Sequence, residues 1–122
     1  MARGRVTGLL GPSGSGKTTL IRCLVGAQQI AAGRVTVLGL PAGSPALRRK
    51  LGYVTQAPAV YEDLTVEENL RYFASVMGAS RATVASLLAE FELKSVAHQL
   101  VRNTSGGQRA RTSLVCALVG DP

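Results

Sequence analysis

The nine residues from Gly11 to Thr19, GPSGSGKTT, restrict the fold of this chain more than any other stretch. Their three glycines and one proline do not suit the interior of a helix or a strand. Residues 5–10 before them are mostly apolar, as in a short buried strand. Residues 16–27 after them indicate a helix, whose expected apolar face is Leu20, Cys23, Leu24 and Ala27. The sequence therefore predicts a strand, a glycine-rich loop and a helix in direct succession.

The glycine-rich loop matches the pattern G-x-x-x-x-G-K-[ST] at every position. Glycines permit the positive φ angles and the close backbone approach with which several N–H groups surround a phosphate. A helix N-terminus adds further unpaired N–H groups. Lys17 is placed to reach the β- and γ-phosphates of a nucleotide, and the Thr18 hydroxyl to ligate Mg²⁺. The predicted nucleotide-binding residues are Gly11, Pro12, Ser13, Gly14, Ser15, Gly16, Lys17, Thr18 and Thr19.

The remaining chain divides into a strand-rich and a helix-rich part. Residues 33–39 and 52–56 read as two further strands, with a turn at 41–45 and one helical turn at 46–51 between them. A first long helix should begin after Thr65, because Thr65 and Glu68 form a capping-box pattern, and end at Gly78. Ser80 can cap a second helix, and a last helix should run from about 109 to 119. The expected core stripes are Val66, Leu70, Phe73, Ala74 and Met77, then Val84, Leu87, Leu88 and Phe91.

A second glycine-hinged helix start is formed by Ser105, Gly106, Gly107 and Gln108. Taken alone, this stretch is equally consistent with a simple N-capped helix after a flexible loop. The free N–H groups and dipole of a helix N-terminus would also bind an anion. One nucleotide needs only one such site in a chain, so the second could serve a nucleotide held by another copy.

Together these motifs resemble the nucleotide-binding domains of ATP-binding cassette (ABC) transporters. Gly11 to Thr19 match the Walker A loop, Gln56 the Q-loop glutamine, residues 63–70 the segment after it, and residues 105–108 the ABC signature. Gln56 follows Lys17 by 39 positions (56 − 17), and Ser105 follows Gln56 by 49 (105 − 56). The resemblance implies an α/β P-loop NTPase, as an ABC-type ATPase domain fragment. Its expected parts are a Walker A and Q-loop core at 1–60, a helical subdomain with the signature at 61–108, and a helix at 109–122.

The resemblance also implies partners and cofactors. Two such domains pair head to tail around ATP, and Ser105, Gly106, Gly107 and Gln108 of one copy face the nucleotide of the other. Thr18 and Gln56 would ligate Mg²⁺. Residues after Gln56, Tyr61 and Glu62 among them, would contact a transmembrane permease subunit. The intervening segments resemble the ATPase subunits of multidrug and other exporter-type systems, so the implied activity is ATP hydrolysis coupled to transport.

The sequence departs from the family pattern in three places. Thr104 stands where the signature normally begins with Leu, at a position of packing more than of phosphate contact. The resemblance implies that the Walker B strand, with its Mg²⁺-anchoring Asp and catalytic Glu, lies beyond Pro122. Residues 118–121 end an apolar run in Asp but are not interpreted as this strand, because Gly-Asp-Pro at 120–122 is ordinary helix-stop chemistry. His98 lies in a polar stretch before the signature, where a surface position is expected. We therefore predict no catalytic residue in the chain and no hydrolysis by this fragment alone.

Composition limits the other functions. The net charge of +7 comes from 14 Lys and Arg against 7 Asp and Glu, but no basic run exceeds residues 48–50 and no aromatic residues interleave with it. Nucleic acid is therefore not an expected partner. Charges interrupt every apolar run before a membrane-spanning length, so we expect a cytoplasmic protein. The resemblance to ABC transporters further implies that it is peripheral on the inner membrane face through its permease. Cys23 and Cys116 are expected to be reduced core residues.

Three alternatives to the exporter subunit remain open from the sequence. The first is a soluble ABC protein that acts on ribosomes or nucleic acid, which the net charge permits. The second is another P-loop enzyme such as a small kinase, which would leave residues 105–108 without a role. The third is a non-catalytic remnant that binds nucleotide weakly or not at all.

Overall fold

The computed structural model describes residues 4–122, which form two compact units. The first unit reaches to Arg48 and the second runs from Arg49 to Pro122. The Walker A stretch lies in the first unit, and both Gln56 and the signature stretch lie in the second.

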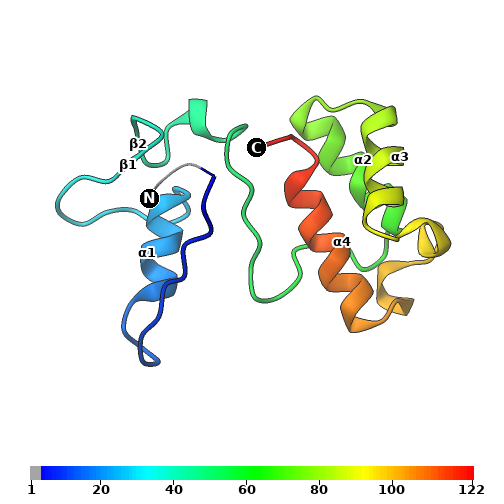
Figure 1. Cartoon of the computed structure of the whole chain (residues 1–122), viewed down its shortest axis with the longest axis horizontal. Coiled ribbons are helices and arrows are strands. Elements are labelled where there is room, and N and C mark those ends of the chain that lie inside the picture. The colour runs from blue at the N-terminus through cyan, green and yellow to red at the C-terminus, as the bar shows by residue number, and fades with distance from the viewer. Residues whose placement is uncertain (1–3) are drawn as a thin grey trace. The chain divides into compact units, whose positions relative to one another are not determined.

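The first unit contains one helix and one small hairpin (Figure 1). Helix α1, Lys17–Leu24, follows the glycine-rich loop as predicted but is shorter at both ends. Strands β1, Thr36–Val37, and β2, Leu40–Pro41, pair antiparallel around a two-residue turn. Both turn residues, Leu38 and Gly39, have positive φ angles, as a tight hairpin turn requires. A single 3₁₀ turn follows at Pro45–Leu47.

The predicted strands at 5–10 and 52–56 are wrong, and the one predicted at 33–39 is reduced to β1. Within residues 4–122, the only strands that pair in a sheet are β1 and β2. An apolar run becomes a strand only when a neighbouring strand accepts and donates its backbone hydrogen bonds. No described residue does so for 5–10 or 52–56, and Val6 and Leu10 are accordingly fully exposed.

The predicted apolar face of α1 is not buried. Leu20 is exposed, Cys23 and Leu24 are half-buried, and Ala27 is exposed beyond the end of the helix. Of the first unit's described residues, 4–48, only Leu47 is buried. The periodicity of α1 therefore identifies a helix correctly, but within this chain that helix has little apolar surface to pack against.

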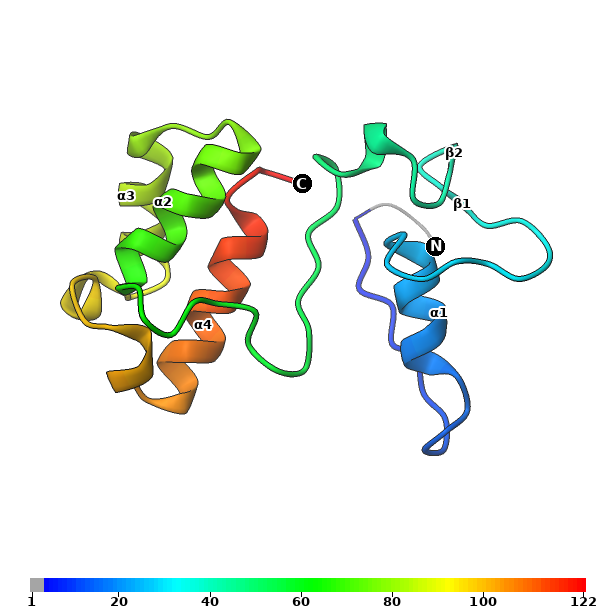
Figure 2. The ribbon, with the colours of Figure 1, turned by 180° about the vertical axis from the view of Figure 1, so that it is seen from behind.

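The second unit is a group of three helices. Helix α2 is Val66–Met77, α3 is Arg81–Glu90 and α4 is Gly106–Leu118. Helix α2 packs against both α3 and α4, as the front and rear views show (Figures 1 and 2). Two 3₁₀ turns, Lys94–Val96 and Val101–Asn103, lie in the connection between α3 and α4.

The predicted caps define the ends of α2 and the start of α3. The Thr65 hydroxyl oxygen accepts a hydrogen bond from the Glu68 N–H, and the Glu68 carboxylate accepts one from the Thr65 N–H at 2.8 Å. The Thr65 hydroxyl also donates to the Glu68 carboxylate at 2.9 Å. The two bonds that this carboxylate accepts, first from the Thr65 N–H and then from its hydroxyl, hold the pKa of Glu68 below its ordinary value. Gly78 ends α2 with a φ of 76°, and Ser80 caps α3 through the Thr83 N–H.

The core of the second unit consists of the predicted helix stripes together with residues of the α3–α4 connection and α4. Val66, Leu70, Ala74, Val84 and Leu88 are buried, and Phe73, Met77, Leu87 and Phe91 pack against them. The two core stripes read from the sequence are therefore confirmed. The remaining buried members are Leu93, Val96, Ala97, Val101, Val115, Cys116 and Val119.

The two cysteines differ in their surroundings. Cys116 is buried in the core of the second unit, and this burial raises the pKa of its thiol to about 12. Cys116 therefore behaves as a small apolar residue, as predicted. Cys23 is only half-buried in α1, and both cysteines are free.

We predict that Leu70→Ala strongly destabilises the second unit. Leu70 is 0% exposed, so its truncation leaves a cavity among α2, α3 and α4. The free energy of unfolding should fall by about 2–5 kcal/mol, measured by urea denaturation of the natural full-length protein. Val76→Ala is the matched control on the same helix, because Val76 is 61% exposed, and it should cost less than about 0.5 kcal/mol. Equal costs for the two variants would contradict the assigned core.

Candidate functional site

The loop before α1 has the backbone geometry expected of a phosphate loop. Gly14 has a φ of 79° and Gly16 one of 86°, both in the left-handed region that favours glycine. Gly16 is also the N-cap of α1 and provides no side-chain cap. The N–H groups of the first helical turn, beginning at Lys17, are therefore left for an external acceptor, and the dipole of α1 favours an anion there.

Lys17 places its positive charge over this loop. Its Nζ donates to the carbonyl oxygen of Gly11 at 2.8 Å, to that of Pro12 at 2.6 Å, and to Ser15 Oγ at 3.2 Å. Gly11 has little room for a side chain, because an added Cβ would lie 3.0 Å from Ser15 Oγ. The Lys17 ammonium group therefore lies against the loop carbonyls, next to the unpaired N–H groups at the start of α1.

The two predicted Mg²⁺ ligands belong to different units. Thr18 is the second residue of α1 and is exposed. Gln56 lies at a bend in the second unit and is also exposed. Both offer neutral oxygen atoms, the ligand type that Mg²⁺ prefers, so the residue chemistry fits the predicted ion.

The signature stretch forms the N-terminus of α4. The helix begins at Gly106, three residues earlier than predicted. The reason is a second capping box, which the pattern Ser-x-x-Gln could have revealed. Ser105 Oγ accepts from the Gln108 N–H at 3.2 Å, and Gln108 Oε1 accepts from the Ser105 N–H at 2.8 Å. Because Ser105 Oγ acts as an acceptor here, its hydroxyl hydrogen can be donated elsewhere.

Gly106 and Gly107 are not required by the fold of this chain. A Cβ added at either position would meet nothing within 4 Å, and neither has a positive φ angle. Glycine in a helix costs about 0.5–1 kcal/mol relative to alanine. Both residues are exposed, so two bare peptide units face outward at the helix start. This is the surface that a close-approaching phosphate group needs, and that Cβ atoms would cover.

Asn69 anchors the segment between Gln56 and α2, a role that sequence reasoning missed. Its Oδ1 accepts from the Tyr61 N–H at 2.8 Å, and its Nδ2 donates to the carbonyls of Tyr61 at 2.9 Å and Thr65 at 3.0 Å. Asn69 is fully buried on α2. The only sequence signal for this role was a polar residue beside Leu70 in the apolar stripe.

Two ion pairs connect the same segment to the start of α4, and these too were missed. Arg102 Nη1 lies 2.9 Å from Asp63 Oδ1, and Arg109 Nη1 lies 3.1 Å from Glu62 Oε1. Arg109 also donates from Nη2 to the carbonyl of Arg102 at 3.3 Å, while its buried Nε has no partner among the described residues. Arg102 and Arg109 flank the signature stretch, so both of its sides are tied to residues 62–63.

A third connection reaches the stretch after Gln56. The Ala59 N–H donates to the hydroxyl of Ser113, a buried residue of α4, at 3.2 Å. The Thr55 hydroxyl donates to the Ala57 carbonyl, so this bond spans Gln56. The chain after Gln56 is therefore fastened to α4.

The departures from the family pattern have local explanations. Thr104 is buried, and its hydroxyl donates to the Val101 carbonyl at 2.7 Å, so a polar residue is satisfied at this packing position. His98 is exposed, as predicted, with its Nδ1 3.5 Å from a Glu67 carboxylate oxygen.

In the part of the chain that the structure describes, we find no helix suited by length and hydropathy to cross a membrane.

Two features define an ATP-binding cassette protein. One is the phosphate-type loop before α1. The other is the signature-type start of α4, which a bend at Gln56 precedes in the sequence. A family model described as "ABC transporter" matches residues 1–122. The chain therefore belongs to the ABC transporter family.

Relatives and solved structures agree with this family. The chain is 43% identical over 125 residues to the probable multidrug ABC transporter ATP-binding protein YbhF of Escherichia coli K12, covering 98% of this chain and 22% of that protein. It is 40% identical over 128 residues to the Nod factor export ATP-binding protein I of Rhizobium sp. N33, covering all of this chain and 42% of that protein.

The structure of an ATP-binding subunit of an ABC transporter matches with a TM-score of 0.79 at 30% identity, over 93% of this chain and 50% of that one. The structure of cbiO1 from Clostridium perfringens, described as part of the ABC transporter complex cbiONQ, matches with a TM-score of 0.78 at 25% identity, over 93% and 49%. The predicted fold class, an ABC-type ATPase domain fragment, is confirmed. The chain spans less than half the length of the curated relatives named here.

We predict that Asn69→Leu loosens the segment after Gln56. The substitution leaves the backbone N–H and C=O of Tyr61 without their partner, so the free energy of unfolding should fall by about 1–3 kcal/mol. Hydrogen exchange should show faster exchange of the Tyr61 amide in the natural full-length protein. Asn103→Leu is the control, because Asn103 is exposed, and it should leave that exchange rate unchanged. Unchanged exchange in Asn69→Leu would contradict the anchoring role.

Proposed function

We propose that the chain forms the Walker A, Q-loop and signature part of the ATP-binding subunit of an ABC exporter. The observation that carries this proposal is the geometry of the Gly11–Thr19 loop. Two of its glycines have left-handed backbone conformations, the helix start after it has no side-chain cap, and the Lys17 ammonium group lies against it. One named relative is described as a probable multidrug ABC transporter ATP-binding protein and the other as a Nod factor export ATP-binding protein, which favours export over action on ribosomes. Membership of the ABC transporter family argues against a small kinase.

Within this proposal the residues from Gly11 to Thr19 bind the phosphates of ATP, and Lys17 contacts the β- and γ-phosphates. Thr18 and Gln56 would hold Mg²⁺, and the bound ion would neutralise charge on the phosphate oxygens. The described loop residues include no carboxylate or imidazole that could act as a general base, so they contribute binding and charge stabilisation to hydrolysis.

We place a second copy of the ATPase domain against the signature helix. Gly106 and Gly107 are exposed in the first turn of α4, where N–H groups have no intrahelical acceptor, and Ser105 has a hydroxyl hydrogen to donate. These groups would approach the γ-phosphate of ATP bound to the partner copy. Gln108 would act indirectly, because its side chain closes the capping box on Ser105.

A permease subunit is the third proposed partner. Tyr61, Tyr72 and Phe73 form an aromatic cluster with ring centroids 5.1–6.3 Å apart, and both tyrosines are exposed. Exposed aromatic groups are frequent anchors of protein interfaces. Tyr61 of this cluster belongs to the segment after Gln56, where the permease contact is expected. Such a contact would hold the protein on the cytoplasmic face of the membrane.

We predict that Lys17→Ala weakens the binding of Mg-ATP about 10- to 100-fold, because charge-assisted hydrogen bonds to the phosphates are lost. Isothermal titration calorimetry on the natural full-length protein measures this loss. Lys50→Ala is the matched control, since Lys50 is an exposed lysine outside the loop, and it should bind as the unchanged protein does. Equal affinities for all three proteins would refute a phosphate role for Lys17.

We predict that Gly106→Ala lowers the rate of ATP hydrolysis without lowering the stability of the fold. The free energy of unfolding should stay constant or rise by up to about 1 kcal/mol, because the added Cβ meets no atom and alanine favours the helix. ATP hydrolysis by the natural full-length protein should fall at least about ten-fold, since the Cβ obstructs the approach of the partner's nucleotide. Ser86→Ala, at an exposed position of α3, is a helix-favouring substitution away from the signature stretch and should leave hydrolysis unchanged. Full hydrolysis in Gly106→Ala would rule out the proposed docking at Gly106.

A further inference from the structure

Two contacts hold the chain on either side of Gln56 against the same helix, α4. Before Gln56, a Cβ added to Gly52 would lie 2.7 Å from the carbonyl oxygen of Ala117, so the chain passes directly against the backbone of the helix. After Gln56, the Ala59 N–H donates to Ser113 Oγ at 3.2 Å. Ala117 and Ser113 both belong to α4. Gln56 therefore lies between two attachments to one helix.

The spacing of these attachments forces the chain between them into a loop. Ser113 and Ala117 are four residues apart (117 − 113), so the two attachment points lie roughly 6 Å apart along the axis of α4. The seven steps from Gly52 to Ala59 (59 − 52) could span about 23 Å if extended. The excess length has to leave the helix and return to it. We call residues 52–59 the Gln56 loop, and Figures 1 and 2 show it beside α4.

Gln56 lies near the tip of this loop. It is four residues after Gly52 and three residues before Ala59, and it is exposed. The hydrogen bond from the Thr55 hydroxyl to the Ala57 carbonyl closes the chain directly across Gln56. Because both ends and the tip of the loop are held, less conformational entropy has to be lost when Gln56 binds a ligand. The Gln56 loop is therefore preorganised.

The residue types at the two attachments are not explained by α4 itself. Ser113 is buried within the helix, where alanine would have the higher helix propensity. Its hydroxyl oxygen instead accepts from Ala59, 54 residues away in sequence. Gly52 has no positive φ angle, so only its close approach to Ala117 requires glycine. Both residues serve the Gln56 loop.

We propose that Ser113 and Gly52 are positioning residues for Gln56 in the binding of Mg²⁺ together with ATP. This inference rests on the proposed function, in which Gln56 would hold that ion. Ser113 fixes one end of the Gln56 loop, and Gly52 lets the other end approach the helix. Neither residue is itself a ligand. Because α4 begins with the signature stretch, one helix carries both the signature and the support of Gln56.

The first test compares nucleotide binding with and without metal in the natural full-length protein. Titration calorimetry gives the dissociation constant of AMP-PNP, a non-hydrolysable ATP analogue, with Mn²⁺ and in its absence. Ser113→Ala should weaken binding with Mn²⁺ about 2- to 10-fold, as expected from the loss of one hydrogen bond. It should leave metal-free binding unchanged. Gly52→Ala should have the same metal-dependent effect, because its Cβ forces the chain away from Ala117.

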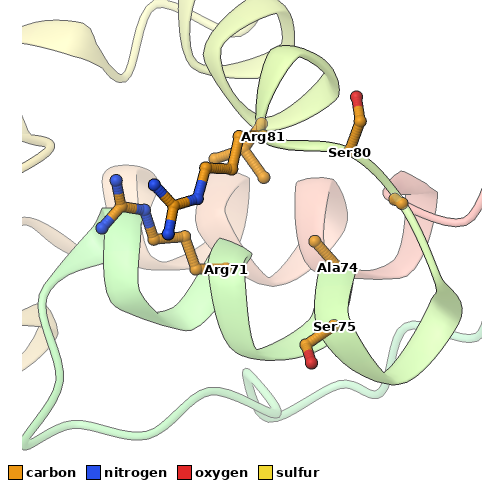
Figure 3. Close-up of a pocket in the computed structure, with 7 residues that line it drawn as sticks. Arg71, Ala74, Ser75, Ser80 and Arg81 are labelled. Carbon is orange, nitrogen blue, oxygen red and sulfur yellow. The ribbon is translucent and has the colours of Figure 1, made fainter.

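Hydrogen exchange tests the attachment without nucleotide. In Ser113→Ala the Ala59 amide should exchange about 2- to 10-fold faster, because it has lost its acceptor. The Leu70 amide in the core should exchange at an unchanged rate. The matched control for both measurements is Ser75→Ala. Ser75 is an exposed serine of α2 beside the hollow that Arg71 and Arg81 line, outside the Gln56 loop and α4 (Figure 3).

A double-mutant cycle separates positioning from a purely structural role. If Ser113 acts through Gln56, Ser113→Ala should cause no further loss of metal-dependent binding in a Gln56→Ala background. An equal further loss in that background overturns the inference. Normal metal-dependent binding in Ser113→Ala, with weakened binding in Gln56→Ala, overturns the inference alone. Normal binding in Gln56→Ala overturns the proposed Mg²⁺ role of Gln56 and the inference with it.

Discussion

The second unit depends on the attachment of residues 62–67 to the chain that precedes α4. Four backbone hydrogen bonds of 2.9–3.2 Å make this attachment, and Thr65 and Leu100 form a bridge within it. The side chain of Asn69, on α2, adds hydrogen bonds to the N–H and the carbonyl of Tyr61. Because the partners are about 35 residues apart in sequence, the attachment closes a loop that contains α2 and α3. It brings the segment after Gln56 and the start of α4 together before any side-chain ion pair is considered.

The sequence predicted best what local chemistry decides. The capping box at Thr65, the glycine stop at Gly78 and the stripe through Leu70 act within a few residues, and each is confirmed. The strands at 5–10 and 52–56 failed because a strand needs a partner far away in sequence, and no local pattern supplies one. The candidate functional site shows the same contrast between local features and distant contacts. The Gly14 and Gly16 conformations follow from the motif, whereas the pairs of Glu62 with Arg109 and of Asp63 with Arg102 join residues that no spacing rule relates.

The two glycine-bearing helix starts use glycine for different physical reasons. At Gly14 and Gly16 the backbone has positive φ angles, so a side chain would strain the chain's own conformation. At Gly106 and Gly107 the φ angles are not positive and the space around the backbone is open. A Cβ there would therefore clash only with a molecule that approaches from outside. The first pair shapes its own loop, and the second pair leaves peptide groups accessible to something outside the chain. This contrast agrees with cis binding of nucleotide phosphates at α1 and trans docking at α4.

The same attachment bears on how the proposed permease contact and the signature would communicate. Residues 62–63 are tied on one side to Arg102 and on the other to Arg109, so they hold both flanks of the signature stretch. Exposed ion pairs are individually weak, about 0–1 kcal/mol, and would break under load. The backbone pairing of residues 62–67 with residues 97–102 therefore carries most of the connection, while the buried Asn69 holds Tyr61 and Thr65 against α2. A displacement at Tyr61 would thus reach the start of α4 through the hydrogen-bonded backbone, with the arginines setting its orientation rather than its strength.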